Sequence, residues 1–253
     1  MLTQEQIRDL ANKYQIDQYT ILREYFQLVF LKYLYLSKAS ENVFFKGGTA
    51  IHFLFGSFRF SEDLDFTCKM TSDQLQHLLI ATMEQLNAEA PHLHLSGPED
   101  QKNAITALIK YSEGVKHPLT VRLEFSLREK PLTRQISPIE TSFPVSPYPL
   151  VVHLSVEELM AEKIRALLMR AKGRDLFDLW LLLSKNIEIK PDYVQKKMSW
   201  YNKEYHPQDI LNKIKHFPEN KLEQDLGKFL PKHYRHFIKQ IKPELIQKLS
   251  GRV

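Results

Sequence analysis

The residue types that could do chemistry concentrate in one short stretch of the chain, residues 44–66. A glycine pair, Gly47 and Gly48, begins an apolar segment there, and two aspartates, Asp63 and Asp65, follow it. A Gly-Gly turn that runs into a helix presents backbone N–H groups to phosphate oxygens. Two carboxylates at positions i and i+2 of a strand point to the same face and can hold Mg²⁺. Together these features predict a nucleotidyltransferase active site.

Hydroxyl groups flank the same stretch. Thr49 follows the glycine pair, and its hydroxyl can donate to a triphosphate. Ser61 precedes the acidic pair and is a candidate to orient it or to touch phosphate, whereas Arg59 fits either of these roles or a surface role. A bare Gly-Gly-Thr is common in simple turns. Its weight as a phosphate loop therefore comes from the Asp-x-Asp downstream.

A third carboxylate is expected on a neighbouring strand, because two-metal transfer chemistry commonly uses one. Residues 121–127 alternate cleanly between apolar and polar side chains, which predicts a half-buried strand. Glu124 lies on the polar face of that strand. It is the candidate third carboxylate if this strand pairs beside the one that carries Asp63 and Asp65.

A second block, residues 155–179, reads as two consecutive helices. Ser155 and Glu158 form a capping-box pattern, and Gly173 is suited to end the first helix. Lys163 lies on the apolar stripe of that helix, where a buried charge costs several kcal/mol unless an anion compensates it. A triphosphate would be such an anion. A lysine at the edge of the stripe, with its amine in water, is the alternative.

Two aspartates follow on the second helix of this block. Asp175 and Asp178 are three residues apart, so they share a helix face and can meet Lys163 across the turn. One of them could orient the lysine, or Asp178 could assist the attacking hydroxyl. A purely structural ion pair with Arg170 or Arg174 is the alternative.

The bulk composition is that of a soluble globular protein: 253 residues, 43% apolar and 26% charged. The chain has one cysteine, Cys68, which excludes an internal disulfide and fits a reducing compartment, the cytoplasm. The apolar run 25–36 is too short and too polar to span a bilayer. Residues 186–253 contain 14 Lys/Arg against 8 Asp/Glu, whereas residues 1–185 contain 21 against 22. This basic C-terminal region favours a polyanionic partner such as RNA, and a solvated lysine-rich helical surface is the alternative.

The pattern of apolar residues predicts an α+β protein in two parts. Helices are expected within 3–38, 49–55 and 72–89, and strands at 43–46, 64–68, 104–111, 119–127 and 133–136. His92 and His94 alternate like metal ligands but lack further ligands nearby, so an exposed strand is the simpler interpretation. A proline-rich linker at 138–149 separates a lobe of residues 1–149 from a helical lobe of residues 150–253.

These blocks together resemble the AbiEii/AbiGii toxin family of nucleotidyltransferases. The resemblance covers about residues 40–185 and is carried by residues 46–49, residues 59–65 and the run 157–178. It implies a DNA polymerase β-like nucleotidyltransferase core with a small mixed sheet, N-terminal helices and a C-terminal helical lobe. It also implies the toxin of a type IV toxin–antitoxin or abortive-infection system, often encoded beside a winged-helix antitoxin.

The resemblance also assigns roles to individual residues. Gly48 and Thr49 match the phosphate motif, in which many relatives carry Gly-Ser. Asp63 and Asp65 match the metal ligands. Lys163 and Asp178 match the catalytic lysine and acid of the second lobe. Some relatives transfer a nucleotide to the tRNA 3′ end, which blocks aminoacylation.

The resulting hypothesis is Mg²⁺-dependent transfer of an NMP from an NTP to an acceptor, with the tRNA 3′ end as the leading candidate. Glu124 or Asp178 would help to activate the acceptor hydroxyl. Two other hypotheses stay open. One is a nucleotidyltransferase that acts on a small molecule or a protein, and the other is a non-catalytic nucleotide-binding module.

Overall fold

The structure, a computed structural model, describes residues 1–113 and 118–250. The chain divides into two compact units. Unit 1 comprises Met1–Gly56 and Phe60–Leu154, and unit 2 comprises Ser57–Arg59 and Ser155–Val253. The sequence prediction placed the division after residue 149. The short segment Ser57–Arg59 was not expected to belong with the second unit.

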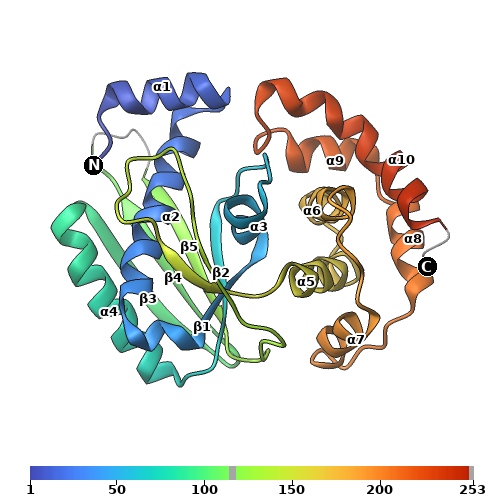
Figure 1. The fold of residues 1–253 in the computed structure, drawn as a ribbon, viewed down its shortest axis with the longest axis horizontal. Helices are drawn as coiled ribbons and strands as arrows, with labels where there is room; N and C mark the ends of the chain where they lie inside the picture. Colours follow the sequence, from blue (N-terminus) through green and yellow to red (C-terminus); the bar gives the residue numbers. More distant parts are fainter. Residues whose placement is uncertain (114–117, 251–253) are drawn as a thin grey trace. The chain divides into compact units, whose positions relative to one another are not determined.

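Unit 1 is an α+β unit (Figure 1). Its helices are α1 (Gln4–Tyr14), α2 (Gln18–Leu36), the 3₁₀ turn η1 (Lys38–Asn42), α3 (Gly47–Phe55) and α4 (Ser72–Glu89). Its strands are β1 (Val43–Lys46), β2 (Asp63–Cys68), β3 (Leu93–Gln101), β4 (Ala104–Tyr111), β5 (Leu119–Ser126), β6 (Gln135–Pro138) and β7 (Leu150–His153).

The strands of the described residues form one mixed sheet in the order β3-β4-β5-β2-β1-β7-β6. β2 runs antiparallel to β1 and parallel to β5. One face of this sheet is apolar and fully buried, with Leu64 and Phe66 of β2 beside Leu123 and Phe125 of β5. Helix α2 covers that face, because its Phe26 packs against Tyr111 on the same side of β4, with ring centroids 4.9 Å apart. The polar side chains of β2 and β5 therefore lie on the opposite face.

The strand predictions hold for the core of the sheet and fall short at its edges. The expected strands at 43–46 and 104–111 match β1 and β4, and the exposed strand expected around His92 and His94 is β3. β3 continues to Gln101 through Gly97 and Pro98, a sequence that obscures a strand but suits an edge position. β7 was missed, because four residues without alternation carry no strand signal. Helix α3 begins at Gly47, two residues before the predicted start.

The regular elements in the described part of unit 2 are all helices, as expected from the sequence (Figure 1). Its elements are α5 (Val156–Met169), α6 (Gly173–Ser184), α7 (Pro191–Ser199), α8 (Pro207–Lys215), α9 (Glu219–Leu226), the 3₁₀ segment η2 (Lys232–Phe237) and α10 (Ile238–Leu249).

The N-cap predicted at the start of α5 is present, because the Ser155 hydroxyl accepts from the Glu158 N–H at 3.3 Å. The Glu158 carboxylate also lies 2.7 Å from the ammonium of Lys197 on α7, which lies 2.6 Å from Glu162. Lys197 is fully buried, so its two carboxylate partners offset the loss of hydration. This buried cluster joins α5 to α7.

Gly173 does not end α5, as the sequence predicted; it is the first residue of α6. The left-handed residue after α5 is Ala171, with φ of 47°. The Gly173 N–H donates to Asp225 of α9 at 2.7 Å, and a Cβ added to Gly173 would lie 2.8 Å from the Cβ of Asp225. Glycine is therefore required here for the close approach of α9 to the start of α6.

No helix in the described part of the chain is long and apolar enough to cross a membrane.

The close approach at Gly173 gives a stability prediction. Gly173→Ala should lower the free energy of unfolding by about 1–3 kcal/mol, because the added methyl group would lie too close to the Cβ of Asp225. Ala171→Gly is the control of opposite sign, since glycine relieves the left-handed conformation without adding atoms. Urea unfolding followed by circular dichroism measures both variants. A Gly173→Ala protein as stable as the wild type would contradict the packing assigned to this residue.

Candidate functional site

The backbone at Gly47 passes directly beside the side chain of Asp65. Gly47 has φ of 81°, in the left-handed region that favours glycine, and a Cβ there would overlap the Asp65 carboxylate. The reason is the register of β1 and β2, which places Lys46 opposite Asp65. The turn that leaves β1 must therefore pass the carboxylate, and only a glycine fits.

Helix α3 begins at this turn. Its N-cap, Lys46, makes no side-chain cap, so the N–H groups of the first turn are not satisfied by that residue. The N-terminal end of a helix attracts anions through these N–H groups and through the helix dipole. Gly47, Gly48 and Thr49 all belong to this first turn, which is the local structure that the phosphate-loop prediction required.

The side chain of Thr49 has a role within unit 1. Its hydroxyl donates to the backbone carbonyl of Asp63, and the residue is fully buried. A hydroxyl has a single proton to donate. In this structure that proton holds the first turn of α3 against the start of β2, so a phosphate contact from Thr49 falls to its backbone N–H.

Asp63 and Asp65 lie on the face of β2 opposite the core. Both are half-buried, whereas the intervening Leu64 is fully buried. The expected pairing with residues 119–127 is present, because β2 and β5 are parallel and Asp65 stands directly beside Glu124. Cross-strand neighbours share a face of the sheet. Glu124 therefore lies on the side of the sheet that the prediction gave it.

The Glu124 carboxylate lies near a cation rather than in a carboxylate cluster. It is about half exposed, and its Oε2 lies 3.7 Å from Nη2 of Arg122 on the same strand. Among the residues that the structure describes, no three His, Cys, Asp or Glu side chains gather closely enough to hold a metal ion. Asp63 and Asp65 still offer carboxylate oxygens, the donor type that Mg²⁺ prefers. The donor chemistry on this face therefore fits Mg²⁺.

Two further contacts fix the backbone around the acidic pair. The amide of Gln27 on α2, which is buried, donates to the carbonyl of Ser61 at 3.1 Å. Lys46 forms an ion pair with Glu129 at 2.7 Å, and both side chains are buried. The sequence offered no signal for Glu129, because it follows the end of β5 and belongs to no periodic pattern.

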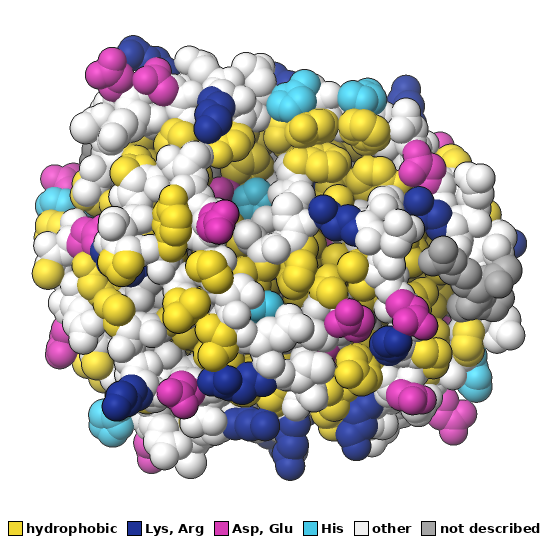
Figure 2. All heavy atoms as spheres, in the orientation of Figure 1, with side chains coloured by type: hydrophobic (Ala, Val, Ile, Leu, Met, Phe, Trp, Pro, Cys, Tyr) yellow, Lys and Arg dark blue, Asp and Glu magenta, His cyan; other side chains and the backbone are white. Residues whose placement is uncertain are grey.

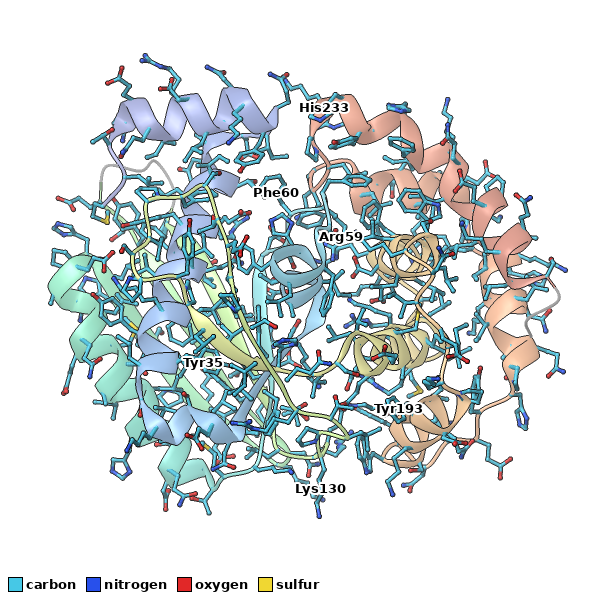
Figure 3. The ribbon with its side chains drawn as sticks, viewed as in Figure 1. Tyr35, Arg59, Phe60, Lys130, Tyr193 and His233 are labelled. Carbon is cyan, nitrogen blue, oxygen red and sulfur yellow. The ribbon has the colours of Figure 1, made fainter. Side chains whose placement is uncertain are left out.

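Unit 2 holds a second group of the predicted residues, which includes Arg59, labelled in Figure 3. Nζ of Lys163 lies 2.7 Å from Oδ2 of Asp178 and 3.6 Å from Oδ1 of Asp175. Arg59 donates to both oxygens of Asp178, from Nε and Nη2, at 2.9 Å each. Arg170 donates to Asp175 at 3.2 Å from Nε and Nη2. The predicted meeting of Lys163 with the two aspartates is confirmed.

Arg59 is the partner that sequence reasoning missed. Its side chain is 2% exposed, which excludes the surface role considered for it. It is separated from Asp178 by 119 residues, so helical spacing gave no indication of the pair. A fully buried arginine that binds both oxygens of a carboxylate is held in one orientation.

The buried charges of this cluster balance one another. Arg59 and Lys163 are paired with Asp175 and Asp178, and the more exposed Arg170 adds a third cation. Burial acts to raise the pKa of Asp175, but the charge of Lys163 and the hydrogen bonds from Arg170 outweigh it and lower that pKa. Lys163 is thus compensated inside unit 2. Its burial alone does not require a phosphate, and its assignment to the triphosphate depends on the family motif.

Solved structures share this fold. MenT4, a nucleotidyltransferase toxin from Mycobacterium tuberculosis H37Rv, matches with a TM-score of 0.69 and 18% identity, over 99% of this chain and 90% of that one. A putative nucleotidyltransferase from Helicobacter pylori matches with a TM-score of 0.56 and 20% identity, over 94% and 99% of the two chains. JHP933, also from H. pylori, matches with a TM-score of 0.54 and 20% identity, over 94% and 96%. At these identities the likeness establishes the fold.

The family follows from sequence comparison. Curated protein sequences give no significant match. The sequence profile described as the nucleotidyl transferase AbiEii toxin of type IV toxin–antitoxin systems matches residues 29–248, which include both groups of residues described above. This chain is therefore a member of the AbiEii family of nucleotidyltransferase toxins.

Proposed function

We propose that this nucleotidyltransferase toxin uses Mg²⁺ to transfer an NMP from an NTP to the 3′ end of tRNA. The observation that carries the proposal is the contact between the Gly47 turn and Asp65. It joins a helix N-terminus suited to phosphate with two carboxylates suited to a cation. The tRNA acceptor is supported by the positive charge of the C-terminal region and by the family.

In the proposed reaction, the first turn of α3 binds phosphate oxygens of the NTP through the N–H groups of Gly47, Gly48 and Thr49. Asp63 and Asp65 would hold Mg²⁺, which when bound neutralises phosphate charge and favours departure of pyrophosphate. The bond between the α-phosphorus and the bridging oxygen of pyrophosphate breaks. A new bond forms between that phosphorus and the acceptor hydroxyl oxygen.

The acceptor hydroxyl must lose its proton, and Glu124 is the better of the two candidates for accepting it. Both oxygens of Asp178 already accept hydrogen bonds or ion pairs from buried cations. These contacts occupy both oxygens and leave neither directed at an acceptor hydroxyl. Glu124 is about half exposed and stands beside Asp65 in the sheet. We therefore assign Glu124 to the proton and Asp178 to positioning.

The proposed role of Lys163 is to bind the triphosphate, and that of Asp178 is to hold Lys163 and Arg59 in place. Asp178 contacts both cations. Ser61 remains a proposed phosphate contact, with its backbone held by Gln27. The antitoxin that a type IV toxin implies is proposed to be a winged-helix protein, as the family resemblance suggests.

The first prediction concerns the acidic pair. Asp63→Asn and Asp65→Asn should each lower transfer by several orders of magnitude, because each removes a charged metal ligand. The matched control is Asp73→Asn, an exposed aspartate of α4 in the same unit, which should keep full activity. The assay incubates protein with total bacterial RNA, Mg²⁺ and each α-³²P-labelled NTP, and resolves the products on a denaturing gel.

Label at tRNA size from the wild type, lost in both variants, is the expected result. Label on protein or on small molecules would replace the tRNA acceptor with another class. NTP binding without pyrophosphate release from any acceptor would favour the non-catalytic module. Near-wild-type transfer by Asp63→Asn or Asp65→Asn would remove these residues from the reaction.

A second prediction separates a functional lysine from a structural one. Lys163→Met should lower kcat by about 100- to 1,000-fold, a loss typical of removing one charge-stabilising donor. It leaves the Arg59–Asp178 pair intact, so the protein should stay folded. The control is Lys197→Met, which removes a second buried lysine, one that pairs with two glutamates of α5. It should reduce stability while the folded fraction keeps its kcat.

Urea unfolding is measured beside turnover for both lysine variants. If Lys197→Met does not fold, Lys32→Met in unit 1 takes its place, because Lys32 also pairs with a carboxylate, Glu89, at 2.7 Å. An equal loss of kcat in Lys163→Met and in the control would mean that Lys163 acts only through stability.

A further inference from the structure

A basic pocket lies in unit 2, where the turn between α5 and α6 meets α9. Its volume is about 330 Å³. Three of its cations come from the turn between α5 and α6 and the first residues of α6. Two come from α9 and from a position two residues beyond its end, and the lining also includes one carboxylate. These residues are Arg170, Lys172, Arg174, Lys221, Lys228 and Asp225. Five positive charges thus surround one pocket against a single negative charge.

The lone carboxylate is already engaged. Asp225 accepts the backbone N–H of Gly173 at 2.7 Å, where it caps the start of α6. Three of the cations, Lys172, Arg174 and Lys221, form no ion pair with a carboxylate among the described residues. Like charges held this close repel one another, and a bound anion would relieve that repulsion.

An aromatic ring organises one wall of the pocket. The guanidinium of Arg174 lies 4.9 Å from the centroid of the Phe229 ring, and Nζ of Lys228 lies 4.5 Å from it. Phe229 itself is 5% exposed, so its ring contacts the two cations but offers little surface to a ligand. The wall therefore presents charge held by cation–π contacts.

On the face that Figure 2 shows, the basic C-terminal region, residues 186–253, does not present an equally dense group of cations. Over α8 and α10 on that face, Lys and Arg side chains are interspersed with Asp and Glu. Three of the five cations of the pocket come from residues 170–174, outside the basic C-terminal region 186–253. The pocket is thus a localised excess of positive charge that the charge of the C-terminal region did not predict.

We propose that this pocket binds backbone phosphates of the acceptor RNA. The inference rests on the proposed function, in which the acceptor is an RNA, and it adds the place where that RNA is held. Guanidinium and ammonium groups are the usual ligands of nucleic-acid phosphates. A docked protein would need an exposed apolar anchor at its centre, and the buried Phe229 does not supply one.

The test is the double variant Lys172→Gln/Lys221→Gln. Both lysines are exposed, so the changes remove charge without disturbing the core. The matched control is Lys213→Gln/Lys215→Gln on α8, which removes the same charge from exposed positions of the same unit outside the pocket. Fluorescence anisotropy with a fluorescein-labelled tRNA transcript measures the Kd of the full-length proteins across a series of KCl concentrations.

The pocket variant should bind tRNA about tenfold more weakly at 0.1 M KCl, and its slope of log K against log salt should fall by about one to two, because two phosphate contacts are lost. The control should stay within about twofold of the wild type, as expected for scattered surface charge. An equal loss in both variants, or no loss in the pocket variant, would overturn the proposal.

Other ligands of the pocket give other patterns. A raised KM for the NTP with unchanged tRNA affinity would mean that the pocket holds the triphosphate of the donor. Displacement of tRNA from the pocket by sodium tripolyphosphate at concentrations near those of the RNA would mean a site for free oligophosphates. Loss of antitoxin binding alone would mean a protein site. Each of these overturns the proposal.

The readouts also separate this inference from the proposed function. If the wild type binds tRNA through the pocket but transfers no nucleotide to it, the proposed acceptor fails and the pocket stands. If transfer to tRNA occurs and the pocket variant has unchanged KM for tRNA, the pocket fails and the proposed function stands.

Discussion

The close approach of Gly47 to Asp65 is the constraint on which the rest of unit 1 depends. The β1–β2 register sets Lys46 opposite Asp65, so the chain must turn into α3 across the carboxylate. A side chain at Gly47 would displace either the helix start or the aspartate. The turn and the acidic pair therefore cannot be varied independently. In the reaction that we propose, one backbone contact thus places N–H groups suited to phosphate beside carboxylates suited to a cation.

Helix α5 takes part in two buried clusters of paired charges in unit 2. It carries one lysine that pairs with carboxylates of α6 and two glutamates that pair with a lysine of α7. Both clusters are buried, and buried pairs contribute little net stability compared with apolar packing. Breaking one of them is costly, however, because an unpaired charge remains. Such pairs fix which helix faces meet, and in the Lys163 cluster they also fix the direction of a cationic group.

Much of unit 1 could be predicted because its signals are local. Alternation in residues 121–127 gave β5, and the spacing of Asp63 and Asp65 around a buried Leu64 gave their shared face. The contact partners of individual side chains were harder to predict. Arg59 with Asp178, Lys46 with Glu129 and Gly173 with Asp225 are contacts between residues distant in sequence, and no periodicity records them. The role of Gly173 was predicted wrongly for the same reason. In the sequence, a glycine that permits close packing of two helices cannot be distinguished from a glycine that ends a helix.

The hydroxyl of Thr49 has a packing role within unit 1 that the sequence did not predict. In this structure the hydroxyl donates to the carbonyl of Asp63 and so ties α3 to β2. Serine can make the same bond, whereas valine, of nearly equal size to threonine, cannot. The position of Asp63 therefore accounts for a hydroxyl at residue 49. The phosphate contact that we propose falls to the backbone N–H groups, which every residue type except proline supplies.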